Sequence, residues 1–76
     1  MADLAMERRH LQEADRHVAE TEGRIAHQEA LAASLDRDGH DTVEAAKLLH
    51  VLRDLLEQLT IHRGLILEAL AEPEGG

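Results

Sequence analysis

The sequence predicts an all-α fold, an antiparallel two-helix hairpin of the coiled-coil-like kind that dimerises into a four-helix bundle. Three observations predict it: a heptad pattern in the first half, a stop-and-start signal at mid-chain, and a leucine-rich helical pattern in the second half. We expect a single domain over 1–76, with helices at about 3–37 and 42–72, a turn at 38–41 and a frayed tail at 73–76.

The first helix is predicted by apolar residues that recur every seven positions, namely Leu4, Leu11, Val18, Ile25 and Ala32. Ala14, Thr21, Gln28 and Leu35 fill the three-four spacing between them. This spacing places all of these side chains on one face of a helix, which a strand could not do. The face is narrow, because several of its residues are small or polar.

Two further residues of the first segment predict local features of the helix. Asp3 has the side chain of an N-cap residue. Gly23 lies in the middle of the helix, where glycine costs ~1 kcal/mol relative to alanine, so we expect another backbone to come close to it.

The run Asp38-Gly39-His40-Asp41-Thr42 interrupts the pattern. Gly39 suits the left-handed conformation of the residue just past a helix end. Asp41 is expected to be the next N-cap, with Glu44 as its capping-box partner three residues later. Because the stop and start signals are so close, the two helices should fold back antiparallel.

The second helix carries a broad apolar stripe that consists of Leu48, Leu49, Leu52, Leu55, Leu56, Leu59, Ile66, Leu67 and Leu70. Ile61 and Leu65 fall outside this stripe, and Pro73 ends the helix. The stripe is wider than one neighbouring helix can cover, and an exposed surplus would mark an interface. The expected interface is this stripe, in particular Leu48, Leu49, Leu52, Leu55, Leu56, Leu59, Ile66 and Leu70, closed over Leu11, Val18 and Ile25.

The composition also favours a partner. In a chain of fewer than ~70–80 residues, the hydrophobic core rarely stabilises the fold by more than ~3–5 kcal/mol. Such folds usually need disulfides, metal or association. The 76-residue chain contains no Cys, which excludes disulfides and thiolate zinc sites. It also contains no Phe, Trp or Tyr. We therefore expect a homodimer, with an unidentified protein partner as a further option.

The charge balance argues against other ligands. Sixteen Asp and Glu against eight Lys and Arg give a net charge of −8, which repels nucleic-acid phosphates and anionic membrane surfaces. No apolar run approaches the ~18 residues of a membrane span, and the first residues lack the apolar region of a signal peptide. The expected partners include neither nucleic acid nor a membrane, and the expected location is cytoplasmic.

The six histidines are His10, His17, His27, His40, His50 and His62. Folding about Gly39 sets His27 level with His50 and His17 level with His62, which suggests metal sites between the helices. His27 points away from the heptad face, however, and the other pair lies at the edges of the apolar faces. We expect no metal or cofactor, with His17 and His62 as weak metal candidates. Protonation of the histidines would remove most of the net negative charge, so pH-sensitive assembly is a further hypothesis.

Arg63 interrupts the apolar pattern near the middle of its stripe. A charge there must pair or reach water, because burying it alone is costly. Asp15 lies at about the same level on the first helix and borders the heptad face. We expect an Asp15–Arg63 ion pair that sets the register of the hairpin.

The segment His50-Val51-Leu52-Arg53-Asp54-Leu55-Leu56 resembles the phospho-acceptor box of sensor histidine kinases, which reads His, acid, Leu or Ile, Arg, Thr or Asn, Pro, Leu. Val51 replaces the acidic residue and Leu55 replaces the proline. The box also falls on the second helix rather than the first. The resemblance implies phosphotransfer through His50 as an alternative function.

A second resemblance covers most of the chain. At Arg16-His17-Val18-Ala19-Glu20, Arg24-Ile25 and Gln28, followed by Asp38-Gly39-His40-Asp41-Thr42, the sequence resembles short helical-hairpin proteins common in alphaproteobacteria. The resemblance implies an intracellular bacterial protein and carries no assigned activity or functional residue.

Neither a Ser-His-Asp arrangement nor a glycine-rich phosphate loop is present in the sequence. We therefore expect no enzyme and no catalytic residue. The leading prediction is a helical self-association or protein-interaction module, with a regulatory role as an option. The alternative is a small histidine-based phosphorelay or metal-binding protein.

Overall fold

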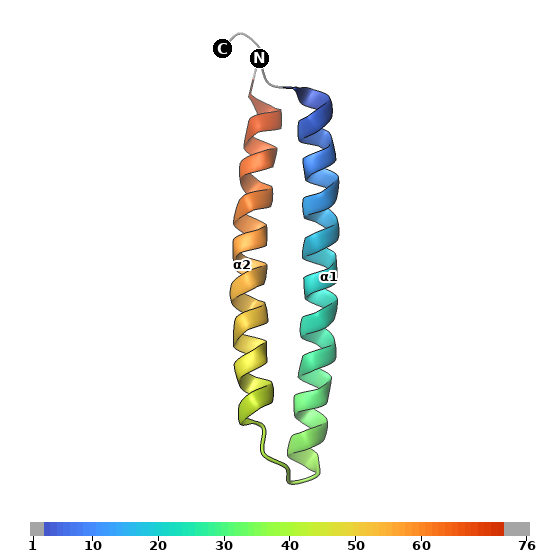
Figure 1. Ribbon diagram of the computed structural model, residues 1–76, viewed down its shortest axis with the longest axis vertical. Helices are drawn as coiled ribbons and strands as arrows, with labels where there is room; N and C mark the ends of the chain where they lie inside the picture. Colours follow the sequence, from blue (N-terminus) through green and yellow to red (C-terminus); the bar gives the residue numbers. More distant parts are fainter. Residues whose placement is uncertain (1–2, 73–76) are drawn as a thin grey trace.

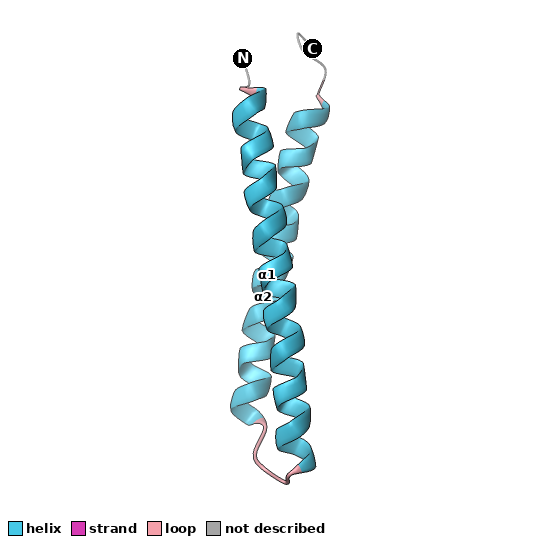
Figure 2. Ribbon diagram, turned by 90° about the vertical axis from the view of Figure 1, so that its right-hand side faces the viewer, coloured by secondary structure: helices cyan, strands magenta, loops and turns pink. Residues whose placement is uncertain are grey.

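The computed structural model describes residues 3–72 and confirms the all-helical hairpin (Figure 1). Helix α1 spans Leu4–Arg37 and helix α2 spans Val43–Ala71, and no strand forms in this part of the chain. The helices run antiparallel and cross near their middles in the view of Figure 2. Helix α1 ends at the expected residue, and the other three helix ends differ from the expected ones by a single residue. The expected tail at 73–76 lies outside the described residues.

Helix α1 begins with the expected N-cap. The Asp3 side chain accepts hydrogen bonds from the backbone N–H groups of Ala5 at 3.1 Å and Met6 at 3.2 Å. These amides have no partner within the helix, so the carboxylate stabilises the first turn.

A Schellman motif ends helix α1. Gly39 adopts a φ of +75°, as its position just past the helix end led us to expect. The N–H of His40 donates to the carbonyl of Leu35 at 2.8 Å, and that of Gly39 donates to the carbonyl of Asp36 at 3.1 Å. These two bonds satisfy carbonyl groups that the helix leaves without partners and turn the chain back toward α2.

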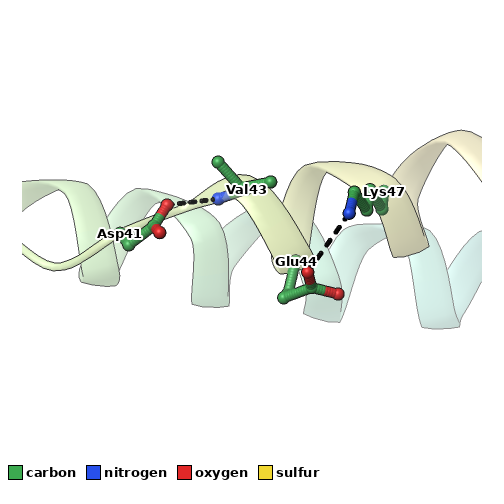
Figure 3. A network of polar contacts seen from close by, with 4 residues as sticks. All are labelled: Asp41, Val43, Glu44 and Lys47. Carbon is green, nitrogen blue, oxygen red and sulfur yellow. Dashed lines mark hydrogen bonds and ion pairs between the residues drawn. The ribbon is translucent and has the colours of Figure 1, made fainter.

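The capping box predicted at the start of helix α2 is wrong. The N-cap is Thr42, one residue later than expected, and its side chain makes no capping hydrogen bond. Asp41 instead accepts a hydrogen bond from Val43 N–H at 2.9 Å, and Glu44 contacts Lys47 Nζ at 3.3 Å (Figure 3). Because the helix starts one residue later, Glu44 is its second residue and not the third, where a capping box requires its carboxylate.

The two helices meet along one contact face, which we call the seam. On α1 the seam follows the predicted heptad, and Ala14, Thr21 and Gln28 are its buried members. On α2 the seam residues alternate in spacings of three and four: Ala45, Leu49, Leu52, Leu56, Leu59, Arg63, Ile66 and Leu70. Only Ala45, Leu49 and Ile66 of these are buried, and the others are half-buried.

The seam contains polar groups. Gln28 is 8% exposed, and its Nε2 donates to the backbone carbonyl of Ala45 at 3.5 Å. Thr21 is 3% exposed. Across the described residues, no buried side-chain nitrogen or oxygen lacks a hydrogen-bond partner. The hairpin therefore accommodates polar side chains at positions where a wider apolar core would hold leucine.

The explanation predicted for Gly23 is wrong for the single chain. A Cβ atom added at Gly23 would meet no atom within 4 Å, so no other backbone of the hairpin approaches it. The residue is exposed and in the middle of α1. Gly23 therefore weakens the helix without a packing reason inside the hairpin.

The same substitution should have opposite effects at the two glycines. Gly39→Ala should lower the free energy of unfolding by about 1–2 kcal/mol, because alanine is strained at positive φ. Gly23→Ala should raise it by roughly 0.5–1 kcal/mol, because alanine favours the helix and has room there. Urea denaturation followed by circular dichroism measures both changes. A destabilising Gly23→Ala, measured on the monomeric hairpin, would contradict the open surroundings of Gly23.

Candidate interaction surface

Helix α2 carries a second apolar face beside the seam. Leu48, Val51, Leu55 and Leu65 are large hydrophobic residues with exposures of 46%, 60%, 41% and 58%. Together with Gln58, His62 and Ala69 they repeat in spacings of three and four, which aligns them along the helix. We call this face the outer stripe. It lies roughly a quarter of a turn around α2 from the seam.

The outer stripe borders one side of helix α1. A groove of about 550 Å³ runs between Leu48 on α2 and Glu20, Arg24 and His27 on α1, with Leu52 at its base. A neighbouring groove is lined by Leu55, Leu59, His17 and Arg24 among others. Because Leu52 and Leu59 belong to the seam, these grooves reach from the surface to the half-buried residues between the helices.

The opposite side of the seam is polar. The Arg63 guanidinium Nε donates to Asp15 Oδ1, as the sequence predicted. Arg53 Nη2 donates to Glu29 Oε2 at 3.2 Å, an ion pair that was not predicted. Asp15 and Glu29 each follow a seam residue by one position, whereas the groove residues His17 and Arg24 each precede one. The hairpin therefore has one side with ion pairs between the helices and one side where the leucines of α2 face polar residues of α1 across the grooves.

The predicted interface residues fall into two groups. Leu49, Leu52, Leu56, Leu59, Ile66 and Leu70 lie in the seam against α1, together with Leu11, Val18 and Ile25 on α1. Only Leu48 and Leu55 of the predicted set lie on the outer stripe, and Leu67, 39% exposed, lies apart from it. Sequence reasoning missed Val51 and Leu65. Tracing a second three-four series from Leu48 along the helix would have found both residues.

The histidines of the described part are exposed and occupy different places. His17 and His27 line the two grooves, whereas His50 lies near Val51 on the outer surface of α2. The structure thus does not bring His27 and His50 into one hollow. His62, the other weak candidate, is on the outer stripe. Within residues 3–72, no three His, Asp or Glu side chains form a group that could hold a metal ion.

The segment that resembles a phospho-acceptor box presents its histidine, His50, to solvent. His50 Nε2 lies 3.3 Å from Asp54 Oδ2, one helical turn later, and both side chains are largely exposed. Val51 and Leu55, which replace the acidic residue and the proline of the box, both belong to the outer stripe.

Comparisons with protein-family models, curated proteins and solved structures give no match for this chain. Over the described residues, neither helix offers a stretch long and apolar enough to cross a membrane. The interpretation of the surface therefore depends on its own geometry.

The Asp15–Arg63 pair should show measurable coupling. Its side chains are 51% and 40% exposed, so we expect a coupling free energy of about 0.5–1 kcal/mol, as for other partly exposed pairs. A double-mutant cycle of Asp15→Asn and Arg63→Gln, read by urea denaturation, measures it. The pair Glu29 and Arg53 provides the matched comparison on the same side of the seam. Additive effects of the two Asp15 and Arg63 substitutions would remove this pair as a register determinant.

Proposed function

We propose that this chain is a non-enzymatic self-association and protein-interaction module, in which two hairpins pair through the outer stripe into a four-helix bundle. One observation carries the proposal. The hairpin buries four hydrophobic residues of the described part, while nine large hydrophobic residues there are exposed. Seven of the nine are on helix α2: Val43, Leu48, Val51, Leu55, Ile61, Leu65 and Leu67.

The quality of the core supports the same proposal. Across residues 3–72, no side chain is less than 2% exposed, so the seam has no fully enclosed layer. A stable small fold needs either a larger apolar core or a cross-link, and cysteine is absent from the sequence. A second hairpin against the outer stripe would cover both the stripe and the half-exposed leucines that line the grooves. Antiparallel hairpins joined in this way form a closed four-helix bundle.

The surface chemistry favours a protein partner over a substrate. The grooves are open, with leucines of α2 on one wall and mostly polar residues of α1 on the other, whereas substrate pockets bury most of a small ligand. Apolar residues aligned at three-four spacing are the usual recognition element between helices. We therefore assign the outer stripe to helix–helix contact and assign no catalytic residue.

A matched pair of lysine substitutions tests the proposal. Val51→Lys places a charge on the outer stripe, whereas Leu67→Lys places it on an exposed residue of α2 that lies apart from the stripe. Burial of a valine contributes roughly 1.5–3 kcal/mol, so Val51→Lys should weaken the dimer at least about tenfold. Leu67→Lys should leave the dimer constant within about twofold. Size-exclusion chromatography with light scattering over a concentration series measures both constants.

The lysine also reduces the net negative charge of the chain, so a loss of assembly cannot come from added repulsion between copies. Circular dichroism checks that the helix content is retained. Equal dimer constants for Val51→Lys and the parent chain would contradict the proposed surface.

A further inference from the structure

We infer that the two copies pair with their α2 helices antiparallel, in the one heptad register that sets Leu48 against Leu65 of the partner subunit. The same register sets Lys47 beside Glu68 of the partner subunit. The inference rests on the proposed function and adds the orientation and contacts of the second copy at the outer stripe.

The outer stripe consists of two columns of residues. Leu48, Leu55, His62 and Ala69 form the first column, and Val51, Gln58 and Leu65 form the second, which Glu44 extends toward the start of α2. In an antiparallel pair of heptad helices, each core layer joins a first-column residue to a second-column residue of the other helix. The antiparallel registers therefore differ by whole heptads, and only a few of them need comparison.

The central register joins Leu48 to Leu65 of the partner subunit, Leu55 to Gln58 of the partner subunit and Val51 to His62 of the partner subunit. Its two-fold axis falls between residues 56 and 57, close to the middle of α2 at Val43–Ala71. The two helices then overlap along their whole length. A shift by one heptad in either direction leaves two turns of α2 without a partner and covers less of the stripe.

Charge selects the same register. Lys47, Asp54, Ile61 and Glu68 lie along the flank of the stripe, each one residue before a first-column position. The central register sets Lys47 beside Glu68 of the partner subunit, and the two-fold axis repeats this pair at the other end. A shift of one heptad sets Asp54 beside Glu68 of the partner subunit or beside Asp54 of the partner subunit. Both shifts bring carboxylates together, which disfavours them.

A parallel arrangement gives neither the mixed core layers nor the Lys47–Glu68 pair of the antiparallel register. Parallel helices bring each stripe residue against its own copy, so Gln58 and His62 would form two adjacent polar layers inside the interface. Lys47 would lie beside Leu52 of the partner subunit, since flanking positions of opposite type meet in parallel pairs. The antiparallel register instead gives every polar stripe residue an apolar neighbour and places a leucine layer near each end.

Lys47 is free to make the contact between subunits. Its Nζ lies 3.3 Å from Glu44 on the same helix, and the two side chains are 68% and 89% exposed (Figure 3). An ammonium group has three donors, so Lys47 can contact Glu44 and a second carboxylate together. Lys47 would therefore lie between Glu44 of its own helix and Glu68 of the partner subunit.

Cysteine cross-linking tests the orientation, because the sequence contains no cysteine. Leu48→Cys and Leu65→Cys are prepared as separate variants, and each is treated alone and as a mixture with a short bifunctional thiol reagent. The mixture should yield a cross-linked heterodimer as the main product, and each variant alone should yield little. A dominant cross-link of Leu48→Cys to itself would overturn the antiparallel register.

Charge exchange tests the register independently. Lys47→Glu and Glu68→Lys should each weaken the dimer by about three- to tenfold, and the double variant should recover to within about twofold of the parent. The carboxylate introduced at position 47 repels Glu44 of the same helix in the single and the double variant alike. A recovered dimer constant in the double variant therefore reports on the contact between subunits. Failure to recover would overturn the Lys47–Glu68 contact. A parent chain that remains monomeric would overturn the proposed function itself, whereas a dimer with the wrong cross-link would overturn only the register.

Discussion

The structure depends on a mismatch between its two helices. Helix α1 has one apolar face, made narrow by Ala14, Thr21 and Gln28, and that face covers a single face of helix α2. Helix α2 has two such faces, so the hairpin leaves the outer stripe exposed however well the seam packs. Exposed apolar area on this scale favours association, because covering it removes apolar surface from water. The four-helix bundle is the simplest symmetric arrangement that covers the second face of α2 in both copies.

Charged residues favour one register of α1 against α2. Leucines along two heptad faces would pack in several registers with little difference in free energy. The Asp15–Arg63 and Glu29–Arg53 pairs lie on one side of the seam and oppose sliding of the helices past each other. Each pair is partly exposed, so it contributes little to stability on its own. A shift in register would separate each charge from its partner, which disfavours the shifted pairing.

The sequence predicted the seam of α1 well, because a strict seven-residue repeat leaves no other face for those side chains. It also predicted the Asp15–Arg63 pair, since a charge within an apolar stripe restricts its partners to a few residues at one level. The Glu29–Arg53 pair was not predicted, because exposed charges on both helices offered many equivalent partners. The start of α2 differs from expectation, because Thr42 occupies the N-cap position without a side-chain hydrogen bond while Asp41 accepts from the N–H of Val43.

The outer stripe was predicted only in part, because the leucines of α2 offer more than one possible face. The sequence predicts one wide face for the leucine run of α2, although the structure separates it into the seam and the outer stripe. The sequence therefore groups Leu48 and Leu55 with Leu49 and Leu56 and does not indicate Val51 and Leu65. Neighbouring leucines cannot be divided between two faces until the position of α1 is known.

Sedimentation equilibrium of the full chain, with a chelator and separately with added zinc, tests the central claim most directly. The account predicts a dimer whose association constant is the same in both buffers, because the outer stripe needs no metal. A chain that stays monomeric in chelator across the micromolar to millimolar range would contradict the account. Assembly that appears only with zinc would assign the contact to the histidines His17, His27, His50 and His62 instead.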